Sequence, residues 1–128
     1  MIVHLDTSVL VEALVPNGAM TQAFRRLLRA GDKPTLSTIV LYEWRRGPRT
    51  PEERALRMAV MPDDLVVSFG PAEAGRAAEL YRAVRRPRGR EADLAIAACA
   101  IEREAALWTL NTGDFDDVPD LMLYRASP

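Results

Sequence analysis

The sequence predicts an α/β protein in which helices cover both faces of a mostly parallel central sheet of four to five short strands. Short apolar runs, such as residues 2–5 and 106–110, alternate with longer segments of helical pattern. Acidic residues stand where these elements begin or end, and Asp6 directly follows the first apolar run. The composition is 48% hydrophobic and 27% charged, which is typical of a globular domain with a real core.

The strands are expected at short apolar runs that are bounded by turn residues or by charge. These runs are residues 2–5, 35–36, 65–69, 106–110 and 121–124. The first run stops at Asp6, as a buried parallel strand does. The run at 65–69 lies between Pro62-Asp63-Asp64 and Gly70-Pro71, which are turn signals on both sides.

The helices are expected where apolar residues recur every three or four positions and a capping residue precedes them. They are predicted over residues 9–14, 19–30, 38–47, 51–61, 71–84 and 91–104. Thr7 or Ser8 is expected to cap the first and Ser37 the third. Pro51 opens the fourth, because proline fits the first helical turn.

The 128 residues are expected to form a single domain spanning 1–128, since no segment resembles an inter-domain linker. No apolar run approaches the roughly 18 residues that span a bilayer, and the N-terminus lacks the basic region of a secretion signal. Cys99 is the only cysteine and cannot form an internal disulfide. These features predict a cytoplasmic protein without a membrane partner.

The formal net charge is −1, which argues against broad electrostatic binding to nucleic acid. Nearly every cation is arginine, with Lys33 the only lysine, and the arginines cluster locally. The clusters are Arg25, Arg26 and Arg29; Arg45, Arg46 and Arg49; and Arg82, Arg85, Arg86, Arg88 and Arg90. Such patches either grip phosphate through the planar guanidinium fork or are solvated helix faces.

Four acidic residues are the strongest functional signal: Asp6, Glu43, Asp93 and Asp114. Each lies near the edge of a predicted element, and ligand sites in parallel sheets lie beyond the carboxyl ends of the strands. Converging carboxylates repel one another unless a hard divalent cation lies between them, and oxygen ligands suit Mg²⁺ or Mn²⁺. The pattern therefore predicts a metal-dependent phosphodiesterase.

Each carboxylate also has a purely structural interpretation. Asp6 can be an N-cap, and Asp93 a first-turn acid that stabilises the helix dipole. Glu43 can be an exposed helix residue paired with one of the arginines that follow it, and Asp114 part of a solvated turn. His4 is expected to be a packed or surface side chain rather than a general base, and Cys99 a small core residue.

Four sequence motifs resemble those of VapC-type PIN domains. They are D-T-S after the first strand, E-x-R-R-G in an early helix, A-D-x-x-I-A-A-x-A, and T-x-N-x-x-D-F. One motif alone is a weak signal, whereas four in this order extend the resemblance from end to end. It implies a PIN-like three-layer α/β/α fold and a metal-dependent endoribonuclease that is the toxin of a toxin–antitoxin pair.

The resemblance also implies the site. Asp6, Glu43 and Asp93 are expected to bind Mg²⁺, with Mn²⁺ as a substitute, and to be catalytic. The fourth acid of the family usually falls on the position of Asn111, which carries no charge here. Asp114, three residues on, is the candidate to supply or support that acid, and Thr7 matches the small polar residue that often follows the first aspartate.

The implied partners are an RNA substrate, a cognate antitoxin protein and a second copy of the chain. Two alternatives stay open at this stage. Asn111 favours a PIN-like interaction module that has lost cleavage, and the same carboxylates also suit a metal-dependent DNA nuclease or a phosphatase. The absence of motifs such as G-x-x-x-x-G-K-[ST] or H-E-x-x-H leaves the carboxylates as the chemical centre.

Overall fold

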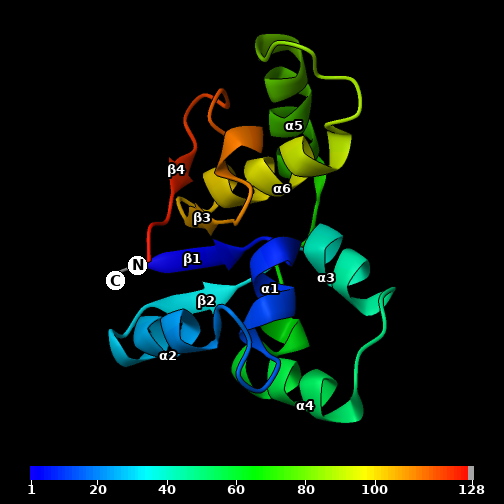
Figure 1. The fold of residues 1–128 in the computed structure, drawn as a ribbon. Coiled ribbons are helices and arrows are strands. Elements are labelled where there is room, and N and C mark those ends of the chain that lie inside the picture. Colours follow the sequence, from blue (N-terminus) through cyan, green and yellow to red (C-terminus); the bar gives the residue numbers. More distant parts are fainter. Residues whose placement is uncertain (127–128) are drawn as a thin grey trace.

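A computed structural model describes residues 1–126 and contains a four-stranded sheet in the order β2-β1-β3-β4 (Figure 1). The strands are β1 (Ile2–Leu5), β2 (Lys33–Thr35), β3 (Ala106–Trp108) and β4 (Met122–Leu123). All neighbouring pairs are parallel. The predicted parallel α/β fold is therefore confirmed, at the lower of the two expected strand counts. The last two residues of the expected domain, 127–128, lie outside the described part.

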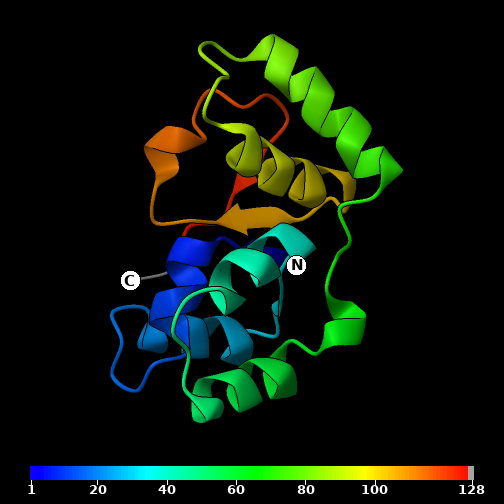
Figure 2. The ribbon, with the colours of Figure 1, turned by 90° about the vertical axis from the view of Figure 1, so that its right-hand side faces the viewer.

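The helices lie where the periodicity places them, within a few residues at each end. They are α1 (Thr7–Ala13), α2 (Thr21–Arg29), α3 (Thr38–Arg45), α4 (Pro51–Val60), α5 (Pro71–Ala83) and α6 (Glu91–Glu102). Helix α2 packs on β2, α6 packs on β3, and α5 packs on α6. Helices thus cover both sides of the sheet, and Figure 2 shows how α1, α3 and α6 gather near the strands.

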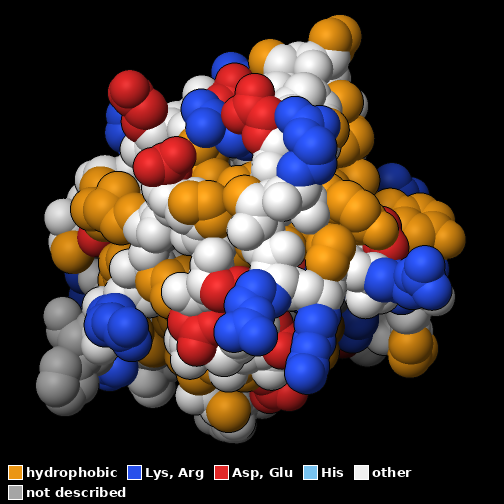
Figure 3. All heavy atoms as spheres, turned by 90° about the horizontal axis from the view of Figure 1, so that it is seen from above, with side chains coloured by type: hydrophobic (Ala, Val, Ile, Leu, Met, Phe, Trp, Pro, Cys, Tyr) orange, Lys and Arg blue, Asp and Glu red, His pale blue; other side chains and the backbone are white. Residues whose placement is uncertain are grey.

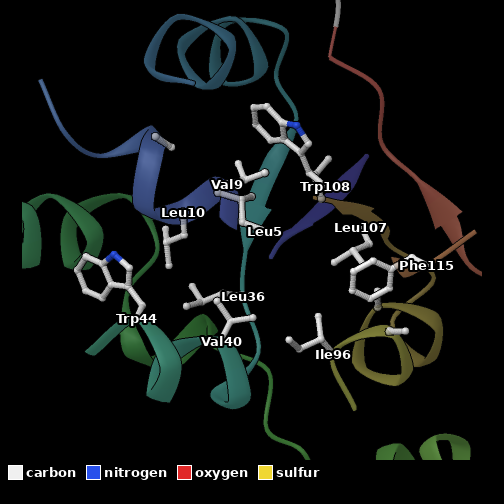
Figure 4. Close-up of a cluster of buried hydrophobic side chains, with 14 of the residues drawn as sticks. Leu5, Val9, Leu10, Leu36, Val40, Trp44, Ile96, Leu107, Trp108 and Phe115 are labelled. Carbon is white, nitrogen blue, oxygen red and sulfur yellow. The ribbon is translucent and has the colours of Figure 1, made fainter. Parts of the chain in front are cut away.

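The core forms because apolar side chains of the central strands meet those of the surrounding helices. Leu5 and Leu107 are fully buried, as are Val9 and Val40 on helices α1 and α3. Figure 4 shows this cluster extending from Trp44 on α3, past the strands, to Ile96 on α6. Close packing in this core holds β1, α1, α3, α6 and β3 in fixed positions relative to one another.

Capping residues explain several helix starts. Ser37 accepts a 3.2 Å hydrogen bond from the N–H of Val40, as predicted for α3. Thr50 and Glu53 form a reciprocal capping box at the start of α4. The predicted cap of α1, Thr7 or Ser8, was wrong, because Asp6 occupies the N-cap position and the helix already begins at Thr7.

The strand predicted at residues 65–69 is also wrong. Asp63–Leu65 form a 3-10 helix, and only Val67 pairs with the sheet region, through an isolated parallel bridge to Ser37. Val67 N–H donates to the carbonyl of Leu36, and its own carbonyl accepts from Thr38 N–H. The chain next to it enters α3 at Thr38, so the pairing does not continue beyond Ser37.

Strands β3 and β4 are shorter than predicted. The expected strand over 106–110 ends at Trp108, because Thr109 and Leu110 bond to Asp6 and to Ser8 in the first turn of α1 instead of to a neighbouring strand. The expected strand over 121–124 is reduced to Met122–Leu123. Tyr124 still donates its N–H to Leu107, and its ring lies 5.1 Å from that of Trp108.

The remaining structural predictions concern buried groups. His4 and Cys99 are both buried, as expected for packed side chains. Burial raises the pKa of the Cys99 thiol to about 11, so it remains protonated at neutral pH. Within residues 1–126, no helix has the length and apolar composition that a membrane span requires.

Candidate metal centre

The polar centre of the fold lies where β1 and β3 end side by side. The chain leaves β1 toward β2 on one side, whereas β3 lies on the other side of β1, so this is a topological switch point. Asp6 follows β1 directly, and Thr109 follows β3. The hydroxyl of Thr109 donates a 2.7 Å hydrogen bond to Asp6 Oδ2 and so joins the residues that follow the two strands.

Asp6 does more than end a strand and begin a helix. Its carboxylate accepts hydrogen bonds from the hydroxyls of Thr109 and Ser8, the latter at 3.2 Å. It forms no side-chain cap to the N–H groups of α1, although it occupies the N-cap position. Capping therefore does not account for this buried carboxylate, which is only 6% exposed.

Glu43 reaches the same region from α3. Thr7 at the start of α1 donates a 2.7 Å hydrogen bond from its hydroxyl to Glu43 Oε1. Within residues 1–126, Glu43 forms no ion pair with Arg45 or Arg46, and the Arg46 guanidinium lies over the Tyr42 ring instead. Thr7, which follows the first aspartate, thus contacts the glutamate through its hydroxyl.

Asp93 lies in the first turn of α6 and is electrostatically coupled to the other three acids. Its pKa is raised to about 6, first by burial and then by the charges of Asp6, Asp114 and Glu43, while Arg90 lowers it. A helix N-terminus alone would favour the charged form and lower this pKa. The upward shift therefore reflects burial first and then the negative charge of three other segments of the chain.

The two candidates for the fourth acid lie on either side of a short 3-10 helix, Thr112–Asp114. Asn111 precedes it and donates its backbone N–H to Thr109 Oγ1 at 3.0 Å. Asp114 ends it, and its carbonyl accepts a hydrogen bond from Arg90. Both side chains are exposed, and Asp114 is the one whose charge acts on Asp93.

Three residues of this network were not singled out for it by the sequence. Ser8 and Thr109 both bond to Asp6, and Arg90 connects α6 to the loop after β3. The motifs contained a signal for the first two, since each is a hydroxyl residue within three positions of a predicted site residue. Arg90 carried no signal beyond its place in an arginine cluster.

The donor groups fit a hard divalent cation in their chemistry, because the side chains that meet here offer only carboxylate, amide and hydroxyl oxygens. In residues 1–126, no three histidine, cysteine, aspartate or glutamate side chains are arranged closely enough to hold a metal ion. The acids are thus coupled electrostatically without forming a finished coordination cluster. The raised pKa of Asp93 shows that a nearby positive charge would be favourable.

Fold and centre together define a parallel α/β protein with a carboxylate site at its switch point. The family model described as "PIN domain" matches residues 3–121. The chain therefore belongs to the PIN domain family, a superfamily of nucleases that generally depend on divalent metal ions. No curated protein matches the chain.

Solved structures of similar shape extend this finding. VapBC2 from Rickettsia felis, bound to a promoter DNA fragment, matches with a TM-score of 0.72 and 21% identity over 99% of this chain and 100% of that one. FitAcB from Neisseria gonorrhoeae matches with a TM-score of 0.69 and 22% identity over 98% of this chain and 97% of that one. VapBC-5 from Mycobacterium tuberculosis, a member of the VapBC family of toxin–antitoxin systems, matches with a TM-score of 0.61 and 24% identity over 98% of both chains. Together with the family match, these likenesses confirm the resemblance to VapC-type PIN domains.

Proposed function

We propose that this chain is a Mg²⁺-dependent endoribonuclease, with Mn²⁺ as a substitute, and the toxin of a toxin–antitoxin pair. The observation that carries the proposal is the coupling of Asp93 to Asp6, Asp114 and Glu43 at the switch point. The charged form of Asp93 is disfavoured there, first by burial and then by the three other carboxylates, and structural stability gives no reason to bring these groups together.

In this proposal, Asp6, Glu43 and Asp93 are metal ligands and catalytic residues, and Asp114 is the fourth acid. When bound, a divalent ion supplies charge neutralisation at the scissile phosphate and an activated water. Thr109 and Thr7 orient the carboxylates of Asp6 and Glu43 through the two 2.7 Å hydrogen bonds. Asn111 supports the centre through its backbone bond to Thr109.

An arginine-lined cavity next to Asp114 supports RNA as the substrate. This open cavity of about 600 Å³ is lined by Arg85, Arg86, Arg90, Gly113, Asp114 and Asp117. Asp117 engages Arg90, whereas within residues 1–126 Arg85 and Arg86 form no ion pair and are exposed. Two free guanidinium groups beside the acids suit the phosphates that flank a cleavage point.

The surface charge is otherwise mixed. On the face seen from above α5, arginine or lysine side chains lie among aspartate and glutamate side chains (Figure 3). The net charge of −1 likewise provides no uniform basic surface. Binding of a single-stranded substrate would therefore depend on local arginines such as Arg85 and Arg86.

An apolar cavity supports the second proposed partner, an antitoxin. Two similar structures are described as VapBC2 bound to a promoter DNA fragment and as a toxin–antitoxin complex. In this chain, a cavity of about 290 Å³ lies between α1, α2 and α4, and its lining includes Phe24, Leu28 and Leu56. Leu28 is 38% and Leu56 44% exposed, so an apolar peptide side chain has accessible surface to bury.

We further propose a homodimer and a cytoplasmic location. Exposed apolar side chains such as Met58, which is 42% exposed, support self-association. The buried, protonated Cys99 suits a reducing compartment but does not require one. Sedimentation at micromolar concentration tests the dimer, and a monomer at high micromolar concentration contradicts it.

The proposed activity is tested by incubating the purified chain with a mixed RNA pool and Mg²⁺ or Mn²⁺. We expect discrete fragments in the metal samples and none with EDTA. The Asp93→Asn variant should be inactive, and Asp116→Asn, an exposed acid in the loop after β3, should cleave normally. A single-stranded DNA of the same length is included as an alternative substrate.

The alternatives give different results in this experiment. A folded wild-type chain that binds Mn²⁺ but prefers DNA points to a DNA nuclease. A folded chain that neither cleaves nor binds Mn²⁺ points to an interaction module, which Asn111 favours. Full activity of Asp93→Asn contradicts the proposed site itself.

A further inference from the structure

Arg90 joins the two segments that carry Asp93 and Asp114. Its backbone stands at the N-cap position of α6, three residues before Asp93, and its carbonyl accepts the N–H of Leu94. Its guanidinium extends to the loop after β3 and donates a 2.9 Å hydrogen bond to the carbonyl of Asp114. One side chain thus connects the start of α6 to the end of the 3-10 helix.

The guanidinium is held in a defined orientation by its other contacts. It binds both carboxylate oxygens of Asp117, at 2.6 and 2.9 Å, and donates to the carbonyl of Arg85 at 3.0 Å. The Arg90 side chain is only 21% exposed. A planar fork bound at four acceptors has little freedom, whereas a lysine could satisfy only part of this geometry.

Two buried apolar side chains also hold the loop after β3. Phe115 is 2% and Val118 7% exposed, so both are packed into the core. The carboxylate of Asp114 is not involved in this packing and remains exposed. The contact of its carbonyl with Arg90 is the hydrogen bond that joins this residue to the start of α6.

We propose that Arg90, held by Asp117, is a positioning residue that fixes Asp114 beside Asp93 and makes Asp114, rather than Asn111, the fourth acid of the centre. The inference rests on the proposed metal-dependent function. The backbone of Asn111 is bonded instead to Thr109, whose hydroxyl bonds to Asp6. The charge missing at position 111 is then supplied three residues later.

The test measures Mn²⁺ binding to the RNA-free protein from the loss of the electron paramagnetic resonance signal of free Mn²⁺. Arg90→Lys, Arg90→Ala and Asp117→Asn should each weaken binding about 10-fold, the effect of losing a residue that orients metal ligands. Arg90→Lys should resemble Arg90→Ala, because the fork and not the charge is needed. Arg88→Ala, which removes an exposed arginine from the turn between α5 and α6, should bind as wild type.

A double-mutant comparison identifies the fourth acid. Asp114→Asn should weaken Mn²⁺ binding by a similar factor, and adding Arg90→Ala should weaken it little further, since both changes remove the same contribution. Asn111→Ala should have little effect. Wild-type affinity in both Arg90 variants, or a loss in Asn111→Ala without one in Asp114→Asn, overturns the proposal.

Hydrogen exchange of the backbone amides of residues 112–117, measured without metal, separates this proposal from the proposed function. Faster exchange in Arg90→Lys, with the amides of α6 still protected, is expected if Arg90 holds the loop. Unchanged exchange overturns the positioning role. A wild-type chain that binds no Mn²⁺ contradicts the metal-dependent function, and the exchange rates still decide whether Arg90 positions Asp114.

Discussion

The hydroxyl of Thr109 donates a 2.7 Å hydrogen bond to Asp6, joining two residues that are 103 positions apart in the sequence. Both are nearly inaccessible, at 5% and 6% exposure. Thr109 Oγ1 also accepts the N–H of Asn111, so one side chain orders the loop after β3 and orients a buried carboxylate. A buried charge without such partners would be strongly destabilising.

Thr109→Val should therefore destabilise the protein, because it keeps the side-chain shape and removes the hydroxyl. We expect a loss of about 1–3 kcal/mol in the free energy of unfolding, typical of a hydrogen bond to a charged group. Urea unfolding at neutral pH measures this value. Thr109→Ser keeps the hydroxyl and should lose less, and equal losses in the two variants would show that packing of the methyl group dominates.

Asp93→Asn should stabilise the metal-free protein at neutral pH while abolishing cleavage. The pKa of Asp93 is about 6 in the folded protein, above its ordinary value of 3.8. The folded state thus prefers the protonated form, so the charged carboxylate is unfavourable above pH 6 and this penalty disappears as pH falls toward 4. Urea unfolding in EDTA should show a higher free energy of unfolding for the variant than for wild type at pH 7.5, and no difference near pH 4.

The same prediction has a matched control. Asp116→Asn removes an exposed acid of the loop after β3 and should change neither stability nor cleavage. A destabilised Asp93→Asn variant at pH 7.5 would mean that its carboxylate makes favourable contacts in the metal-free protein. That outcome would argue against uncompensated charge at the centre.

His4 should make the fold sensitive to acid. It is 2% exposed, and within residues 1–126 neither ring nitrogen has a hydrogen-bond partner. Burial, followed by the charge of Arg103, lowers its pKa from 6.5 to about 4. The folded state therefore excludes the proton, and stability falls as pH drops from 6.5 through 4, by about 3 kcal/mol for this group.

The measurement compares urea unfolding of wild type and His4→Leu at pH 7, 5.5 and 4. The difference between the two curves isolates His4 from the carboxylates that titrate over the same range. Wild type should lose stability relative to the variant as pH falls. Parallel curves would mean that His4 is protonated in the folded protein or that water satisfies the charged ring.

Replacing Arg85 and Arg86 together by alanine should weaken RNA binding and reduce its salt dependence. Each lost phosphate contact lowers the slope of log K against log salt by about 0.7 for a single strand, so the pair should lower it by about 1.4. Binding of a labelled RNA in EDTA, where no cleavage is expected, gives this slope. Arg25→Ala with Arg26→Ala removes the same charge from α2 and should leave the slope nearly unchanged.

Elements with local signals could be predicted from the amino-acid sequence. The apolar run ending at Asp6, the Ser37 cap and the alanine-rich α6 were all identified correctly, because periodicity and capping depend on neighbours within a few residues. The order of the motifs also indicated the PIN domain family, which the family match over residues 3–121 confirms. The site residues carried by those motifs remain predictions.

Features that depend on partners distant in the chain became visible in the folded structure. Residues 65–69 have the composition of a strand but make a single bridge, because the edge beside them turns into α3 after Ser37. The bond from Thr109 to Asp6, the raised pKa of Asp93 and the contact of Arg90 with Asp117 likewise join distant segments. Hydrogen bonding and charge coupling act through space, so they could be identified only once packing had brought these segments together.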